Sequence, residues 1–199
     1  YTERFLKNFY KGYDKDIFSS FIDRGLAFTK PYGRLGFMSP FVWMFISSHE
    51  YLRSRLITKE TICSLIQLEY SGFEGATVPV CTFTLQKNLI RGYKGCYIKL
   101  SDFKGADKQS PKTLEAINNR KSKWFYESSQ DTFKKITGLP IAYWTTRNMR
   151  QIFQHGIHFG EWASPCQGMA TTNNNLFLRY WPEVAHSKIN FSCKSSQPF

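Results

Sequence analysis

The stretch YSGFEGATVPVCTFTL, residues 70–85, is the part of the sequence on which the rest of the prediction depends. Its first part, SGFEG, has neither a helical nor a strand period, and its two glycines give the backbone freedom that other residues lack. The second part, Thr77 to Leu85, has side chains suited to burial on both faces of a strand. We therefore predict a loop that presents the ring of Phe73, followed by a strand covered on both sides, as in α/β proteins.

The composition indicates a folded protein with an anionic partner. The chain has 199 residues, 42% of them hydrophobic, so it can bury a sizeable core. Lys and Arg number 27 against 15 Asp and Glu, which gives a net charge of +12 and suits nucleic acid. A membrane surface is a poorer fit, because we find no segment that combines a basic face with a strong apolar stripe. No apolar run is long enough to span a bilayer, and we expect a cytoplasmic protein without a membrane partner.

The cysteines and acidic residues exclude two kinds of site. The five cysteines are an odd number without zinc-ligand spacing, so we predict reduced thiols and no metal site. Asp14, Asp16, Glu69 and Glu74 do not form the paired constellation that a hydrolase needs, and a nuclease ranks last among the functions considered. The glycine-rich G-x-G-x-x-G loop, the Walker loop, and the hydrolase motifs H-E-x-x-H and G-x-S-x-G are also missing from the sequence.

Helical and strand patterns alternate along the first half of the chain. Only about six residues separate the strand predicted after residue 60 from the strand of the opening stretch, which is too short for a crossover helix and predicts an antiparallel hairpin. The predicted elements are a helix from Ile17 to Leu26 capped by Asp14 or Asp16, a strand from Arg34 to Met38, a helix from Phe41 to Leu56 with Tyr51, Leu52 and Leu56 inward and Arg53 and Arg55 outward, and a strand from Thr61 to Tyr70.

The second half is predicted to contain shorter elements. We expect a strand at 95–100, a polar connector at 101–112, a short helix at 114–118, a strand at 124–128, a helical turn at 130–136 and a helix at 146–154. After Gly156 the helical period is lost, and we expect strands and polar turns.

Two segments allow both a structural and a functional interpretation. Phe73 either plugs the local core or offers a stacking surface for a base. The segment CQGMATTNNNLFL, residues 166–178, is either an Asx-rich hairpin turn before an aromatic strand or a loop whose amides and hydroxyls reach phosphates or base edges. The chemistry of this segment alone favours the turn.

Three motifs in order resemble one family. They are GRLGFMSP at 33–40, LEYSGFEGATVP at 68–79, and QGMAT at 167–171 with Asn174, Asn175 and Phe177. Together they resemble adenine-specific DNA methyltransferases, most closely the large PglX-type methylases of BREX phage-defence systems and related restriction-modification methylases. The resemblance covers nearly the whole chain. It implies an α/β fold, namely the C-terminal half of a Rossmann-like class I methyltransferase sheet that ends in an antiparallel hairpin.

The resemblance also implies a chemistry and a set of site residues. The family uses S-adenosyl-L-methionine to methylate the exocyclic amine of an adenine flipped out of double-stranded DNA, and Phe73 occupies the position at which a ring packs against that adenine. Residues 1–136 correspond to the catalytic domain, and residues 137–199 to a linker and the mixed α+β start of a target-recognition domain. The candidate DNA contacts in that second part are Gln167, Gly168, Thr171, Asn174 and Asn175.

The sequence departs from the family in two motifs. It lacks the glycine-rich cofactor loop and the Asn/Asp-Pro-Pro-Tyr/Phe tetrapeptide, and Ser39-Pro40-Phe41 matches a later turn of the family instead. We therefore expect an internal piece of the methyltransferase that begins just after the tetrapeptide, with no catalytic or cofactor-binding residue of its own. The alternative is a non-catalytic DNA-binding or assembly module. A truncated sheet would expose the strand from Arg34 to Met38, so we expect self-association, besides contacts with other defence-system subunits.

Overall fold

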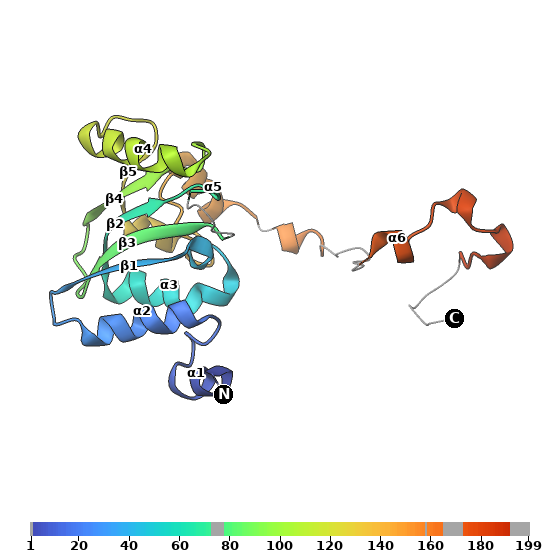
Figure 1. The fold of residues 1–199 in the computed structure, drawn as a ribbon, viewed down its shortest axis with the longest axis horizontal. Helices are drawn as coiled ribbons and strands as arrows, with labels where there is room; N and C mark the ends of the chain where they lie inside the picture. Colours follow the sequence, from blue (N-terminus) through green and yellow to red (C-terminus); the bar gives the residue numbers. More distant parts are fainter. Residues whose placement is uncertain (1, 73–77, 158, 165–172, 192–199) are drawn as a thin grey trace. The chain divides into compact units, whose positions relative to one another are not determined.

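The computed structural model, shown in Figure 1, describes residues 2–72, 78–157, 159–164 and 173–191. The chain divides into two compact units, residues 1–156 and 157–199. Within the described residues, no helix is both long enough and apolar enough to cross a membrane.

The first unit is built on a five-stranded mixed sheet with the order β1-β3-β2-β4-β5. The strands are β1 (Arg34–Pro40), β2 (Thr61–Gln67), β3 (Val80–Gln86), β4 (Lys94–Lys99) and β5 (Phe125–Ser129). The β1/β3, β2/β3 and β4/β5 pairs are antiparallel, whereas β2 and β4 run parallel. The predicted hairpin is confirmed, since Gln67 at the end of β2 lies opposite Cys81 near the start of β3.

The two faces of the sheet are covered unequally. On one face, α2 (Ile17–Phe28) and α3 (Glu50–Lys59) pack against the buried side chains of β3, as the lower helices in Figure 1 show. On the other face, α4 (Ala106–Asn118) contributes to a smaller cluster in which Val80 is only partly buried. The alternate residues of β3 are therefore buried on the first face (Cys81, Phe83, Leu85) and half-buried on the second (Val80, Thr82, Thr84). The predicted burial of this strand on both faces is therefore complete on the first face and partial on the second.

The helix predicted from Phe41 to Leu56 is wrong. The segment forms two 3-10 turns, η1 (Phe41–Met44) and η2 (Ser47–His49), before α3 begins. The guanidinium of Arg53 lies at this break, where its Nη1 donates to the carbonyl oxygens of Trp43 at 2.7 Å and Ile46 at 2.6 Å. Those carbonyls would accept bonds within the helix if an α-helix ran through them.

The predicted orientation of α3 is also wrong at two positions. Arg53 was expected to face outward, yet it is only 1% exposed and also donates from Nε and Nη2 to the carbonyl of Gly138, at 3.0 and 2.7 Å. Tyr51 was expected to face inward, yet it is 58% exposed. Leu52 and Leu56 are buried as predicted. A guanidinium that finds several carbonyl acceptors can take a core position that hydrophobic periodicity assigns to an apolar residue.

In the second half, one predicted connector is a helix. The segment 101–112 was expected to be polar and turn-rich, but α4 begins at Ala106 and includes Pro111. The other predicted elements are present, with β4 and β5 at the expected positions, the turn η3 at Gln130–Lys135 and the helix α5 at Arg147–His155. Thr146 caps α5 by accepting a hydrogen bond from the backbone of Met149.

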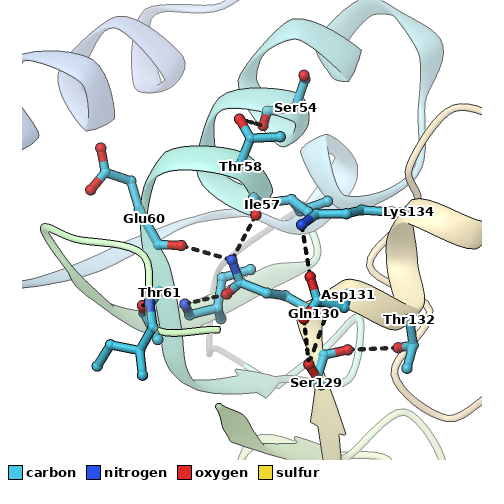
Figure 2. Close-up of polar contacts among 12 residues, drawn as sticks. Ser54, Ile57, Thr58, Glu60, Thr61, Ser129, Gln130, Asp131, Thr132 and Lys134 are labelled. Atoms are coloured by element: carbon cyan, nitrogen blue, oxygen red, sulfur yellow. Dashed lines mark hydrogen bonds and ion pairs between the residues drawn. The ribbon is translucent and has the colours of Figure 1, made fainter. Parts of the chain in front are cut away.

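A buried glutamine joins η3 to the first face of the sheet, as Figure 2 shows. Gln130 Nε2 donates to the carbonyl oxygens of Ile57 and Glu60, both at 2.7 Å, and so satisfies the C-terminal end of α3. Its Oε1 accepts from the backbone nitrogen of Ile62 in β2 at 3.0 Å. One side chain therefore fixes where α3 ends and where β2 begins.

In the second unit, the expected strands are not found among residues 159–164 and 173–191. The described elements are four short helical turns: η4 (Phe159–Glu161), α6 (Asn174–Phe177), η5 (Trp181–Glu183) and η6 (His186–Lys188). Asn173 Oδ1 accepts from the backbone nitrogen of Leu176 at 3.1 Å. This local bond closes a helical turn where an aromatic strand was predicted, because Asn side chains offer the backbone an alternative to a strand ladder.

Candidate functional site

Three strands of the sheet end at one edge, which we call the carboxyl edge. Because β1 and β2 are both antiparallel to β3, and β4 is parallel to β2, the three run in one direction and end at Pro40, Gln67 and Lys99. The chain leaves β2 after Gln67 and enters β3 at Val80 at the same edge. Ligands of open α/β sheets bind outside the carboxyl ends of the strands, so this edge is the candidate site.

Backbone hydrogen bonds hold both roots of the β2–β3 connection. Leu68 donates to the carbonyl of Val80 at 3.1 Å, and Gly72 donates to the carbonyl of Glu69 at 2.9 Å. On the returning side, the carbonyl of Pro79 accepts from Phe41, just after β1, at 3.1 Å. The points at which the connection leaves and re-enters the sheet are therefore set by β1, β2 and β3 together.

Gln109 of α4 fastens the first root of this connection. Its side chain is 6% exposed, and its Oε1 accepts from the backbone nitrogen of Glu69 at 3.1 Å. Its Nε2 donates to the carbonyls of Phe103 at 2.6 Å and Gly105 at 2.9 Å. The same side chain closes off Gly72, where a Cβ would lie 2.8 Å from the Glu69 carbonyl and 3.1 Å from Gln109. Sequence reasoning missed Gln109 because it assigned this segment to a connector.

The titratable groups at the carboxyl edge are poor nucleophiles and bases. A hydrogen bond from the Ser71 hydroxyl, 2.5 Å from Glu69 Oε2, lowers the pKa of Glu69 and favours the ionised, surface-charge role expected for it. Burial raises the pKa of the Cys81 thiol to about 12, which leaves it protonated. Among the described residues, no group of three or more His, Cys, Asp and Glu side chains could hold a metal ion.

An aromatic wall stands beside the ends of β2 and β4. The Tyr143 hydroxyl donates to Gln67 Oε1 at 2.9 Å, and the Tyr143 ring stacks on Tyr97 with 4.7 Å between ring centroids. Burial raises the pKa of Tyr143, so its hydroxyl stays a neutral donor. Trp144 follows, with Lys99 Nζ 4.6 Å from the centre of its ring. The ammonium group of Lys99 and the half-buried indole of Trp144 therefore lie together at the carboxyl edge.

The predicted site residues fall largely outside the described part of the chain. Phe73 belongs to the five residues 73–77 that are not described, and Gln167, Gly168 and Thr171 belong to a second such segment. Asn174 and Asn175 begin α6, and the carbonyl of Asn175 accepts from Arg179 Nη1 at 2.8 Å. The roles of these candidates stay predictions.

The described residues do not fit an adenosyl cofactor. Such cofactors are held in α/β sheets by a glycine-rich turn that lets the backbone approach the ligand at the start of a helix. One described strand, β4, leads through a short turn into a helix, and that turn contains Gly105. The space beside Gly105 is filled, since its Cβ position lies 2.5 Å from Asp107 Oδ1.

Comparison with known sequences finds methyltransferases along the chain. Residues 1–73 match the family of Eco57I restriction-modification methylases. The sequence is 32% identical over 198 residues, 98% of this chain, to adenine-specific methyltransferase PglX of Lacticaseibacillus casei (strain Zhang). It is 29% identical over 187 residues, 92% of this chain, to adenine-specific methyltransferase BrxX of Escherichia coli O9:H4 (strain HS). The chain spans 16% of the length of PglX and 15% of BrxX.

Comparison with solved structures agrees at the level of the fold. The methyltransferase subunit of a type I restriction-modification system from Streptococcus thermophilus superimposes with a TM-score of 0.51 at 19% sequence identity. The similar region covers 66% of this chain and 32% of that subunit. The predicted α/β methyltransferase fold is confirmed, and so is the similarity predicted from the three sequence motifs.

Proposed function

We propose that this chain, as a relative of the adenine-specific methyltransferases PglX and BrxX, is part of an enzyme that transfers a methyl group from S-adenosyl-L-methionine to the exocyclic amine of adenine in double-stranded DNA. The observation that carries the proposal is the 32% identity to PglX over 98% of the chain. The position of the β2–β3 connection at the carboxyl edge supports it, because this is where a ligand of an α/β sheet binds.

In this proposal the chain supplies one wall of the base pocket. Phe73 packs against the flipped adenine, since an aromatic ring can stack on any nucleobase. Gln109 and the backbone bonds at Leu68 and Gly72 hold the root of the loop that carries Phe73. A rigid root limits the positions that the ring can take, which is what a stacking residue requires.

The cofactor and the polar clamp for the amine come from residues of the longer enzyme. The 199-residue chain by itself is then inactive and does not bind S-adenosyl-L-methionine. The second part, 137–199, opens the target-recognition region and contacts DNA through Gln167, Gly168, Thr171, Asn174 and Asn175. The enzyme works in the cytoplasm in restriction-modification or phage defence, with other defence-system subunits as partners.

The test uses the full-length enzyme that contains this chain, expressed in a bacterial strain that lacks adenine methylation. We expect N6-methyladenine at one sequence motif, detected by sequencing of native DNA. The isolated chain should show no heat of binding with S-adenosyl-L-methionine in calorimetry. An unmethylated genome would contradict the proposed activity, and tight cofactor binding by the isolated chain would contradict the assignment of the cofactor site to other residues.

Substitutions of Phe73 separate base stacking from core packing. We expect Phe73→Leu to lower methylation by about 10-fold or more and Phe73→Tyr to keep most of it, because stacking is worth about 1–3 kcal/mol and needs an aromatic ring. Thermal unfolding of the three proteins should agree within a few degrees. Equal losses of activity and of thermal stability in Phe73→Leu would favour the core-plug interpretation instead.

The second candidate function is a non-catalytic DNA-binding or assembly module. The net charge of +12 favours it, since a strongly basic chain binds polyanions without any chemistry. It predicts salt-dependent DNA binding by a full-length protein that methylates nothing. Methylation by that protein would decide against it.

A further inference from the structure

Helix α5 has two distinct exposed faces. Its nine residues, Arg147–His155, include none that is buried. Arg147, Gln151 and Gln154 follow the i, i+4, i+7 spacing of one helical face, while the opposite face carries Met149, Ile152 and Phe153, which are 48%, 68% and 52% exposed. The expectation that no segment combines a basic face with an apolar stripe is therefore wrong for this helix.

The charge around α5 is mainly positive, although the turn η3 also carries Asp131. Residues 132–160 contain no Asp or Glu but include Lys134, Lys135, Arg147 and Arg150. The turn η3, which carries the two lysines, lies beside α5. Lys134 is paired with Asp131 at 2.7 Å, whereas Lys135 and Arg147 take part in none of the ion pairs within the described residues. This surface is complementary to a polyanion.

The polar face of α5 carries the residue types that read DNA bases. Arg pairs with guanine and Gln with adenine through two hydrogen bonds at the base edge, and the major groove admits an α-helix. No hydrogen bond within the described residues uses the side chains of Arg147, Gln151 or Gln154, so these groups are available. The side chain of Arg150 is held in one orientation, because its Nη1 donates to the carbonyl of Thr145 at 2.8 Å.

The position of α5 in the chain links it to the candidate site. The helix begins three residues after Trp144, whose ring lies beside Lys99 at the end of β4. Tyr143 is bonded to Gln67 at the end of β2. The chain therefore passes from the carboxyl edge directly into the basic helix.

We propose that α5 lies against double-stranded DNA, with Arg147, Gln151 and Gln154 facing the major groove and Lys135 and Arg150 beside the flanking phosphates. The proposal rests on the proposed function for its partner, DNA, and adds the surface that contacts it. A helix that lies on a membrane surface is rich in Lys and Arg along its polar face, whereas two of the three residues on that face of α5 are the uncharged Gln151 and Gln154.

The first test measures how salt affects the binding of the 199-residue chain to a fluorescent DNA duplex. We expect the Lys135→Ala/Arg147→Ala variant to bind about 10-fold more weakly at low salt, with the slope of log affinity against log salt reduced by about 1 per lost phosphate contact. The matched control, Lys11→Ala/Lys15→Ala, removes the same charge from exposed positions before α2 and should bind within about twofold of the unchanged chain. Equal losses in the two variants would overturn the proposal, as would an unchanged chain that does not bind DNA.

The second test removes the uncharged groups of the polar face. In the full-length enzyme, Gln151→Ala/Gln154→Ala should weaken binding to the DNA sequence that the enzyme methylates by about 5–10-fold. The slope of log affinity against log salt should not change, because contacts to bases release no counterions. Thermal unfolding should not change, since α5 has no buried residue. An unchanged affinity would overturn the proposal that these glutamines contact bases, and with it the placement of α5 in the major groove.

A third arm separates DNA from a membrane and from the methylation proposal. The chain is also tested for binding to vesicles of phosphatidylglycerol. If it binds them through Arg147 and more tightly than it binds DNA, the assignment of α5 to DNA is overturned. If the full-length enzyme methylates DNA equally well with and without the α5 substitutions, only the role of α5 is wrong. If the unchanged enzyme does not methylate, the proposed function is wrong whatever α5 binds.

Discussion

Arg53 is the residue whose position could least be predicted from the pattern around it. The sequence places it between apolar positions of a predicted helix, where a charged side chain normally faces solvent. In the structure its guanidinium is buried and donates to the carbonyls of Trp43, Ile46 and Gly138, the last of which is 85 residues away in the sequence. Burial lowers the pKa of Arg53, but the carbonyl dipoles around the group offset much of that cost.

We expect Arg53→Met to lower the free energy of unfolding by about 3–5 kcal/mol, because the buried carbonyl of Trp43 and the partly buried carbonyls of Ile46 and Gly138 lose the guanidinium donor. Arg53→Lys should recover part of this loss, since a lysine keeps the charge but not the planar fork. Urea unfolding followed by circular dichroism measures both variants. Arg91→Met, at an exposed position, is the matched control and should change stability by no more than about 0.5 kcal/mol. A small effect of Arg53→Met would mean that water or a nearby donor replaces the guanidinium.

Two glutamines have the same kind of role as Arg53. Gln109 joins α4 to the root of the β2–β3 connection, and Gln130 joins η3 to α3 and β2. In each case both the amide oxygen and the amide nitrogen are used by backbone groups, as buried polar groups require. A glutamine in a polar segment gives no sequence signal that distinguishes this role from an exposed position.

Among the elements, the hairpin of β2 and β3 was the most predictable. A short connection between two strand-like segments favours an antiparallel pair over a crossover. The prediction assumed about six connecting residues, whereas β2 ends at Gln67 and β3 begins at Val80, so the pairing was predicted correctly from a connection taken as too short. The 3-10 turns η1 and η2 were not predictable in this way. Their residues have a helical pattern, and nothing in that pattern indicates that the carbonyls of Trp43 and Ile46 accept hydrogen bonds from Arg53.

The strand β1 forms one edge of the sheet, as predicted for Arg34 to Met38. The backbone nitrogen of Lys87 donates to the Gly33 carbonyl, and that of Phe41 donates to the Pro79 carbonyl. In this register, the odd-numbered residues of β1 are the ones that form backbone hydrogen bonds with β3. The backbone groups of Arg34, Gly36 and Met38 therefore point away from β3. An edge of this kind is a template for pairing with another chain.

We expect the 199-residue chain to self-associate through β1, visible in sedimentation velocity as a species larger than the monomer that grows with concentration. Met38→Lys should return it to the monomer, because a lysine on an edge strand opposes edge-to-edge pairing. The matched control is Met149→Lys in α5, where the methionine is 48% exposed compared with 50% for Met38. A monomeric unchanged chain, or a monomer produced by the control alone, would show that β1 is not the contact.

At the scale of the whole molecule, the two units differ in what holds them together. The main buried cluster extends in sequence from Tyr13 to Tyr143 and includes Ile141, and both buried clusters lie within residues 1–156. The division at residue 156 follows this packing. The predicted boundary between residues 136 and 137 follows a change in sequence pattern, and the domain assignment stays a prediction.

Two truncations test the boundary. We expect a chain that ends at Gly156 to unfold within a few degrees of the full chain, because both buried clusters remain. A chain that ends at Ile136 loses Ile141 and Tyr143 from the core and should be less stable by at least about 4 kcal/mol, or fail to fold. Differential scanning calorimetry compares the two. Equal stability of both truncations would support the boundary at residue 136.

The sequence by itself determined the strands, the β2–β3 hairpin, the basic charge and the similarity to adenine-specific methyltransferases. These depend on short-range patterns or on motifs that are read directly from residue order. The tertiary structure alone decided that Arg53 is buried, that α3 begins at Glu50, and that Gln109 holds the root of the loop carrying Phe73. The physical reason is that each depends on partners far away in the sequence, such as the Gly138 carbonyl for Arg53 and the Glu69 backbone for Gln109, 40 residues apart.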